Sequence, residues 1–234
     1  MDIAEAMACR HAVRDYSDRP VAPDTLARLG EAVAQANRDG DLHIQLVGDG
    51  GNGTDAFGGC PTHYGRFRNV RHCIALIGRD DDNADAGDLD ERVGYYGERL
   101  ALTATMLGLD TSWVVLHEPD RHDGAWLIGD GERMPAAIAV GYGTRPGRPH
   151  RSKPIDQLGS TEHGGLDDAP DWFIMGLEAA ALAPSALGKQ PVHFTLLDDG
   201  TVRAEALDGV QSEICLGIAR LHFEVGAGGL CRFC

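Results

Sequence analysis

Ala136-Ala137-Ile138-Ala139-Val140-Gly141-Tyr142 is the stretch that decides the fold class of this 234-residue chain. It is almost continuously apolar, which is typical of a strand that is buried on both faces. It is also far shorter than the ~20 residues that a membrane-spanning helix needs. We therefore expect this stretch to be a central strand of a sheet.

Segments on both sides of this stretch predict further strands and the helices between them. Asp199-Gly200 lies between the last two strands and is typical of a hairpin turn. The predicted strands are 42–47, 73–77, 113–116, 136–142, 192–197 and 201–206, and the predicted helices are 3–9, 23–40, 93–107, 172–182 and 214–225. This mixed order predicts an α+β fold with a central, mostly antiparallel sheet flanked by helices.

Two patterns occur twice along the chain. A helix followed by a short loop and a His-containing strand appears at 26–47 and again at 177–197, and glycine-initiated helices appear at Val93-Gly94 and Leu216-Gly217. These repeats predict an internal duplication, although two amphipathic helices can also resemble each other by chance. We divide the chain into halves at 1–160 and 161–234 and expect both to pack as one domain.

The composition excludes several classes of partner. There are 21 Lys and Arg against 36 Asp and Glu, which gives a net charge of −15. Such a field repels phosphate backbones and anionic lipid, so we expect neither nucleic acid nor a membrane as a partner. The beginning of the chain lacks the apolar core of a signal peptide, and we predict a cytoplasmic protein. The acidic segment 80–91 lacks the glycine and the closing glutamate of a calcium loop and is interpreted as a solvated loop.

The cysteines and histidines show no metal or disulfide pattern. Six scattered cysteines favour free thiols in a reducing compartment. Cys231 and Cys234 form a C-x-x-C, but no partner motif accompanies it. His63, His72 and Cys73 are the best candidate ligands, but they lack a tight spacing. We therefore expect no metal site.

The first cluster that suggests chemistry is Arg10-His11-Ala12-Val13-Arg14, where the first predicted helix ends. Arg10 and Arg14 place two permanent cations four positions apart, and the planar guanidinium suits a phosphate. Surface salt bridges with Asp15 and Asp18 are the alternative.

Two further clusters follow the central strand. Arg148, His150, Arg151 and Lys153 lie in a Pro- and Gly-rich linker, where they either hold an anion or form a solvated charge run. Ala183–Pro191 has two prolines that bracket small residues, and its backbone could lie against a flat ring. An ordinary helix-to-strand connection is the other interpretation of this loop.

Taken in order, these clusters resemble the FMN-dependent nitroreductase family, in the branch that carries two duplicated halves in one chain. The family's opening motif R-x-S-x-R is similar to Arg10–Arg14, and its P-S-x-x-N-x-Q-P loop is similar to Pro184–Pro191. Four further segments are similar in the same order: 94–98, 108–113, 141–143 and 151–154.

The resemblance implies an FMN site. It implies that Arg10, Arg14, Arg151 and Lys153 surround the phosphate, and that the ring rests on Pro184–Gly188 and on the backbone after Trp113. It implies no catalytic side chain, because the flavin carries the chemistry, and it places Arg14 near the flavin edge. The implied cofactor-binding positions are Arg10, His11, Ala12, Arg14, Trp113, Val114, Arg151, Lys153, Pro184, Ser185, Ala186, Leu187 and Gly188.

Two residues depart from the family pattern. Ala12 stands where the family has Ser, and Gly188 stands where it has Asn. Each lost hydrogen bond is worth about 0.5–1.5 kcal/mol, so we expect weakened FMN binding.

The resemblance also implies an activity. It implies an oxidoreductase that passes a hydride from NAD(P)H through FMN to a small-molecule acceptor, such as a nitroaromatic or a quinone. The alternative is a flavin-binding or flavin-storage protein without turnover. We expect a monomer that acts as a pseudo-dimer, or a homodimer.

Overall fold

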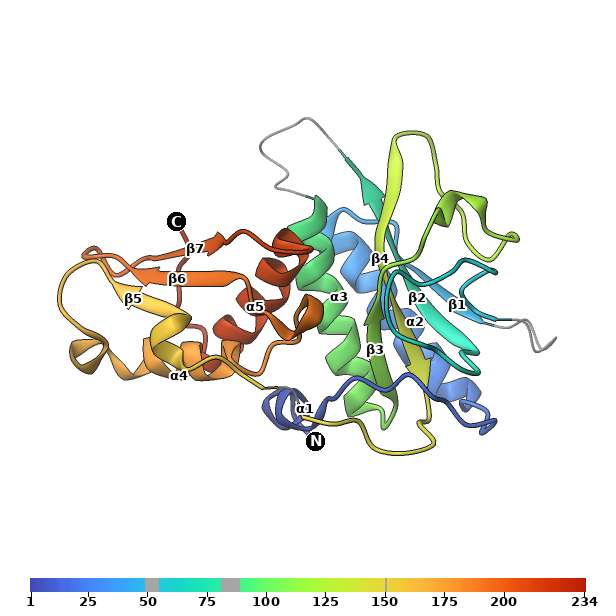
Figure 1. Cartoon of the computed structure of the whole chain (residues 1–234), viewed down its shortest axis with the longest axis horizontal. Coiled ribbons are helices and arrows are strands. Elements are labelled where there is room, and N and C mark those ends of the chain that lie inside the picture. The colour runs from blue at the N-terminus through green and yellow to red at the C-terminus, as the bar shows by residue number, and fades with distance from the viewer. Residues whose placement is uncertain (49–54, 81–88, 150) are drawn as a thin grey trace. The chain divides into compact units, whose positions relative to one another are not determined.

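The computed structural model describes residues 1–48, 55–80, 89–149 and 151–234, which divide into two compact units. Figure 1 shows the elements of both. The first unit contains Met1, Cys9–Leu89 and Arg99–Pro149, and the second contains Asp2–Ala8, Asp90–Glu98 and His150–Cys234. The elements do not test the predicted division at residue 160 or the duplication, and both stay predictions. No helix among the described residues is long and apolar enough to cross a bilayer.

The first unit is built on a four-stranded sheet in the order β1-β2-β4-β3, and every neighbouring pair is antiparallel. The strands are β1 (Gln45–Gly48), β2 (His72–Arg79), β3 (Asp110–Val114) and β4 (Glu132–Gly141). Ile138 of β4 lies between Ile74 of β2 and Trp113 of β3. The predicted central strand is therefore confirmed.

Burial explains why the sequences of the inner strands are continuously apolar and do not alternate between apolar and polar residues. Cys73–Ile77 and Ala136–Gly141 are buried at every position, because both faces of the inner strands are covered. The ladder between β2 and β4 is irregular between Leu76 and Gly78. Pro135 of β4 lies at this irregularity, where a residue without an N–H is tolerated.

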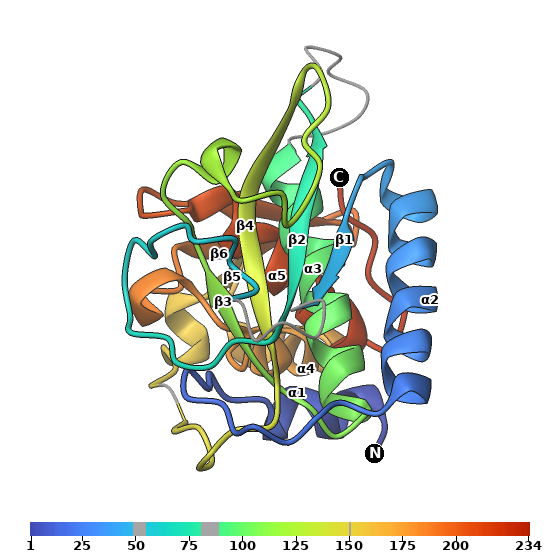
Figure 2. The same ribbon diagram turned by 90° about the vertical axis from the view of Figure 1, so that its right-hand side faces the viewer.

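Helix α2 (Pro23–Gly40) lies alongside β1 (Figure 2) and sets where that strand begins. Asn37, near its end, accepts a hydrogen bond from the Ile44 N–H at 2.7 Å and donates one to the Ile44 carbonyl at 2.9 Å. These bonds satisfy the Ile44 backbone locally, so the prediction that the strand begins at Leu42 is wrong. It begins at Gln45.

The second unit contains a three-stranded sheet in the order β5-β6-β7. Its elements are α4 (Asp171–Ala180), α5 (Ser212–Gly226), β5 (Gly159–Thr161), β6 (Val192–Leu196) and β7 (Val202–Ala206). The β6–β7 hairpin and its Asp199-Gly200 turn are confirmed, and Gly200 adopts a φ of 79°. Strand β5 pairs with β6 in parallel and escaped prediction because it is only three residues long.

The remaining helices are α1 (Ile3–Cys9) and α3 (Leu89–Met106). The prediction that α3 begins at Val93 is wrong, because Asp90 and Glu91 occupy its first turn. Acidic side chains are favourable there, since they face the positive end of the helix dipole. Residues 81–88 of the predicted acidic loop lie outside the described residues.

Helices α3 and α5 cross within the second unit at Gly94 and Gly217. A Cβ on Gly94 would overlap the Ile214 carbonyl, and a Cβ on Gly217 would overlap the Glu91 carbonyl. Both glycines are inside their helices. The interpretation of these glycines as helix initiators is therefore wrong, and their role is to let two backbones touch.

Candidate functional site

The Arg10–Arg14 segment is extended and follows the edge strand of the first unit. The Val13 N–H donates to the Thr111 carbonyl at 3.0 Å, and Ala12 forms a parallel bridge with Thr111. Where the segment is docked, Ala12 and Arg14 are exposed and Val13 between them is buried. Arg10, two residues before the bridge, is also buried, at 6% exposure.

Arg14 is held by its neighbours rather than by counter-charges. Its guanidinium carbon lies 5.9 Å from the centre of the Phe67 ring, and its carbonyl accepts a hydrogen bond from the Arg68 N–H at 2.9 Å. Gly65, at a φ of 83°, passes so close that a Cβ there would lie 3.0 Å from the Arg14 Nε. In the part of the chain that the structure describes, Arg14 forms no ion pair with Asp15 or Asp18. The salt-bridge alternative therefore finds no support at Arg14, whose charge is available to a ligand.

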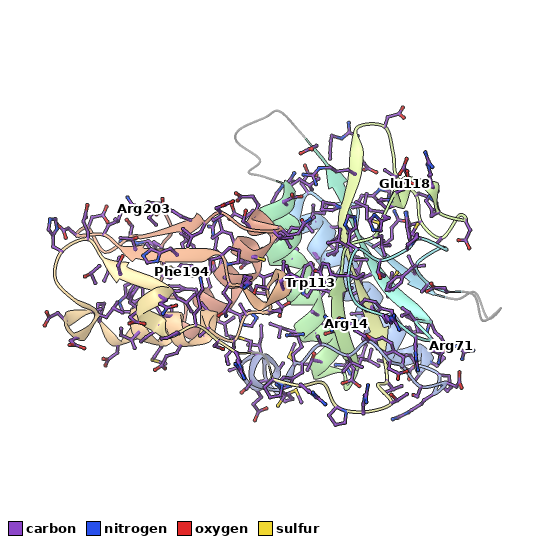
Figure 3. The ribbon with its side chains drawn as sticks, viewed as in Figure 1. Arg14, Arg71, Trp113, Glu118, Phe194 and Arg203 are labelled. Atoms are coloured by element: carbon purple, nitrogen blue, oxygen red, sulfur yellow. The ribbon has the colours of Figure 1, made fainter. Side chains whose placement is uncertain are left out.

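Other candidate residues of the first unit lie close to this segment. His11 pairs through Nδ1 with the Cys9 carbonyl at 2.8 Å. Trp113 is half-buried and is labelled in Figure 3. Val114 is buried, and both residues belong to β3, the strand that contains Thr111. The structure thus brings together the six candidate positions of this unit: Arg10, His11, Ala12, Arg14, Trp113 and Val114.

In the second unit, a buried glutamine connects the basic segment to the Pro-Ser loop. Gln190 is 2% exposed, and its Oε1 accepts the Lys153 N–H at 2.7 Å. Its Nε2 donates to the Ala181 carbonyl at 3.0 Å, and its carbonyl accepts from Lys153 Nζ at 2.9 Å. Ser152 Oγ donates to the same Ala181 carbonyl at 2.6 Å. Gln190 was not among the predicted site residues, although its motif was, and it fixes both segments.

The Pro-Ser loop is held in a strained backbone conformation. Leu187, Gly188 and Gln190 have φ values of 54°, 66° and 45°. For a bulky residue such as leucine this conformation is costly, on the order of 1–3 kcal/mol, and such outliers gather at functional sites. Yet Leu187 is 61% exposed, so no burial of its side chain offsets the strain.

Contacts beneath the loop keep it in place. Ser185 Oγ accepts the Gln190 N–H at 2.9 Å, and the Ala186 N–H lies 3.3 Å from the buried Cys215 sulfur. Burial raises the pKa of the Cys215 thiol, so it is present as the neutral thiol. Gly188, above this support, has nothing within 4 Å of the place where a Cβ would be. The loop therefore presents open, rigid backbone at Leu187 and Gly188.

The basic residues of this unit differ in their exposure and in their hydrogen bonds. Arg151 is exposed, and Lys153 is half-buried. Since an ammonium group has three donors and one of them bonds the Gln190 carbonyl, Lys153 keeps two for another acceptor. His150, from the predicted basic cluster, lies outside the described residues.

Each unit, taken by itself, contains residues that suit part of a phosphorylated flat ligand such as FMN. The first unit supplies Arg14 without an ion pair among the described residues, and the second supplies the partly used Lys153 and the open backbone at Gly188. The positive φ of Gly188 also suits asparagine, which tolerates this region better than most residues. Compared with the asparagine of the family motif, Gly188 therefore lacks the side-chain amide but keeps the same loop conformation.

Cys231, the first cysteine of the C-terminal C-x-x-C, differs from a reactive thiol. All six cysteines are free. Burial, followed by the charge of Glu224, raises the pKa of Cys231 to about 11, whereas reactive thiols have lowered values.

The comparisons with known proteins agree with this architecture. The profile of a family described as "Putative TM nitroreductase" matches residues 2–227. The chain belongs to this nitroreductase family. The search of curated proteins finds no match.

Solved structures show the same fold at low sequence identity. A "putative nitroreductase" from Thermotoga maritima is 20% identical, with a TM-score of 0.64 over 97% of this chain and 83% of that one. A "putative nitroreductase in complex with FMN" from Desulfovibrio desulfuricans is 19% identical, with a TM-score of 0.53 over 68% and 95%. A "putative NADH dehydrogenase/NAD(P)H nitroreductase" from Parabacteroides distasonis is 22% identical, with a TM-score of 0.54 over 70% and 98%. The α+β, nitroreductase-like fold class is therefore confirmed.

Proposed function

We propose that this chain binds FMN and transfers a hydride from NAD(P)H to a small electron acceptor of the nitroaromatic or quinone class. The observation that carries the proposal is the Pro-Ser loop, whose exposed and strained Leu187-Gly188 backbone is held from below by Gln190 and Cys215. Membership of the nitroreductase family supports it, as does the neighbour that is described in complex with FMN.

The proposal assigns candidate residues to each unit. Arg10 and Arg14 belong to the first unit and Arg151 and Lys153 to the second, and we propose each pair as donors of charge-assisted hydrogen bonds to the phosphate. The loop Pro184–Gly188 and the backbone after Trp113 offer flat surfaces to the ring. When bound, FMN would supply the redox chemistry, because it accepts two electrons as a hydride and passes them on. The protein would orient NAD(P)H and the electron acceptor.

Arg14 has a second proposed role besides binding. As a permanent cation near the polar edge of the ring, it would stabilise the negative charge that reduction adds. No side chain is needed as a proton donor in this scheme, so we assign no catalytic acid or base. The acceptor's own chemistry decides which product forms.

A titration of the apo-protein with FMN and with riboflavin tests the phosphate site. Hydrogen bonds to a charged group contribute about 1.5–3 kcal/mol, so we expect FMN to bind at least about tenfold more tightly than riboflavin. Arg151→Gln should reduce that preference by removing one cation. Arg203→Gln is the matched control, because Arg203 is exposed and pairs with Glu205. Equal affinity of the wild type for both flavins would contradict the assignment.

A further inference from the structure

Two neighbouring parallel strands of the second unit bring a histidine and two carboxylates together. Thr161, the last residue of β5, is in register with Leu196, the last residue of β6. Glu162 and His163 follow β5 directly, and Asp198 follows β6 at the start of the hairpin turn. Because parallel strands end at the same edge of a sheet, their next side chains project into one region.

The geometry of the three side chains is that of a compact ligand set. His163 Nδ1 lies 3.0 and 2.9 Å from the two carboxylate oxygens of Asp198. One ligand atom from each of Glu162, His163 and Asp198 lies within 4.8 Å of the others. The backbone sets their spacing, since the Asp198 N–H donates to Glu162 Oε2 at 3.1 Å and the Glu162 N–H donates to the Leu196 carbonyl at 2.8 Å.

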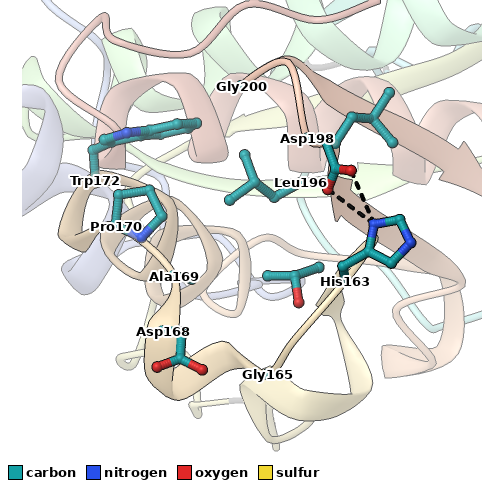
Figure 4. A pocket seen from close by; sticks show the side chains of 11 residues that line it. His163, Gly165, Asp168, Ala169, Pro170, Trp172, Leu196, Asp198 and Gly200 are labelled. Atoms are coloured by element: carbon teal, nitrogen blue, oxygen red, sulfur yellow. Dashed lines mark hydrogen bonds and ion pairs between the residues drawn. The ribbon is translucent and has the colours of Figure 1, made fainter.

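A cavity of about 330 Å³ opens beside this cluster. His163 and Asp198 form one side of it, and Trp172 and Pro170 lie across from them (Figure 4). Its lining contains two carboxylates and neither lysine nor arginine, so its field attracts a cation. Thr161 also lines the cavity, and its hydroxyl oxygen, which is out of contact with solvent, has no hydrogen-bond partner among the described residues.

We propose that Glu162, His163 and Asp198 bind a divalent transition-metal ion of the Zn²⁺ class at the rim of this cavity. Imidazole nitrogen and carboxylate oxygen are both ligands that Zn²⁺ binds in proteins, whereas Mg²⁺ and Ca²⁺ prefer oxygen ligands alone. Three protein ligands leave a coordination position open, and the cavity with Trp172 provides room for a small ligand there.

One effect opposes metal binding at this site. The hydrogen bond and the charge of Asp198 raise the pKa of His163, and a metal must displace the proton that Asp198 stabilises. The metal also takes the place of the His163–Asp198 contact. Both costs lower the affinity for the metal, so we expect an ion that binds reversibly and not a permanent structural ion. This site lies within the second unit alone and does not depend on the proposed flavin chemistry.

Calorimetric titration of the full, chelator-treated chain with Zn²⁺ tests the proposal. We expect one equivalent to bind, and His163→Ala and Asp198→Asn each to weaken it by at least about tenfold. Both side chains are exposed, so these variants keep the fold. The matched control is His43→Ala, because His43 forms the same kind of pair, with Glu132 at 2.8 Å, but belongs to no three-ligand cluster among the described residues. It should bind zinc like the wild type.

Substitution of Co²⁺ for Zn²⁺ identifies the ligand type. Nitrogen and oxygen ligands alone should give no thiolate-to-metal charge-transfer absorbance. A strong charge-transfer band would place the metal on cysteines, such as Cys231 and Cys234, and would overturn the proposal. Absence of zinc binding in the wild type, or wild-type affinity in both His163→Ala and Asp198→Asn, would overturn it as well.

Discussion

Gly217→Ala is expected to destabilise the protein by about 3 kcal/mol or more, the upper end of the effect of inserting a methyl group into a packed contact. The new Cβ would overlap the Glu91 carbonyl and lie 2.7 Å from the Tyr95 nitrogen. Both are backbone atoms of α3, so no side-chain rotation relieves the clash. For a chain of this size, the expected loss in the thermal midpoint is roughly 6–12 °C.

Gly30→Ala is the control for this experiment. Gly30 is also inside a helix, α2, but nothing lies within 4 Å of its would-be Cβ. Alanine there should stabilise the helix by roughly 0.5–1 kcal/mol, because glycine loses more backbone entropy on folding. If Gly217→Ala melted like the wild type or like Gly30→Ala, the close contact between α3 and α5 would be wrong.

The second large effect is expected at the buried pair of Glu98 and His222, both 0% exposed. His222 Nδ1 lies 3.2 Å from the Ala179 carbonyl, which only accepts, so we assign a proton to Nδ1. Nε2 lies 3.1 Å from Glu98 Oε1, so these two atoms are within hydrogen-bond distance of each other. Removing one partner of a buried ion pair destabilises a protein by about 3–5 kcal/mol.

Denaturant unfolding of three variants checks this pair. We expect His222→Ala and Glu98→Ala each to lower the free energy of unfolding by most of this 3–5 kcal/mol. Glu98→Gln should lose much less, because its amide can donate to the neutral Nε2 of His222 and no charge remains buried. Equal losses in Glu98→Gln and Glu98→Ala would contradict this account, because they would show that the amide does not replace the hydrogen bond of the carboxylate to His222.

The strands that were predictable are those whose signal lies within the strand itself. The apolar stretch 136–142 marks the centre of the sheet because both faces of β4 are covered, and Asp199-Gly200 marks the hairpin because the turn needs a positive φ. The start of β1 was not predictable in this way. It depends on Asn37, a residue of the preceding helix that takes over the Ile44 backbone.

The crossing of α3 and α5 shows a second limit of sequence patterns. A glycine inside a helix has no local sign that says whether it ends the helix, weakens it or touches another backbone. Gly94 and Gly217 could be assigned the third role only once their helices were seen to cross.

The candidate site was predictable where its signal lies within one contiguous segment. The Arg10–Arg14 and Pro184–Pro191 motifs are short and contiguous, and the resemblance to a family found them. The opposite burial of Arg10 and Arg14, and the bonds of Gln190, depend on how distant segments dock. The cluster of Glu162, His163 and Asp198 joins two loops 35 positions apart, and no contiguous motif signals it.

The central claim, that this chain is a flavin-dependent oxidoreductase, is tested most directly by anaerobic stopped-flow mixing of the FMN-saturated protein with NADH or NADPH. We expect the visible absorbance band of oxidised flavin to bleach with at least one of the two nucleotides. Arg14→Gln should bleach more slowly, because the cation that favours the reduced state is lost. If the wild-type protein bleaches with neither nucleotide, the claim is contradicted, and the chain binds flavin without turning it over.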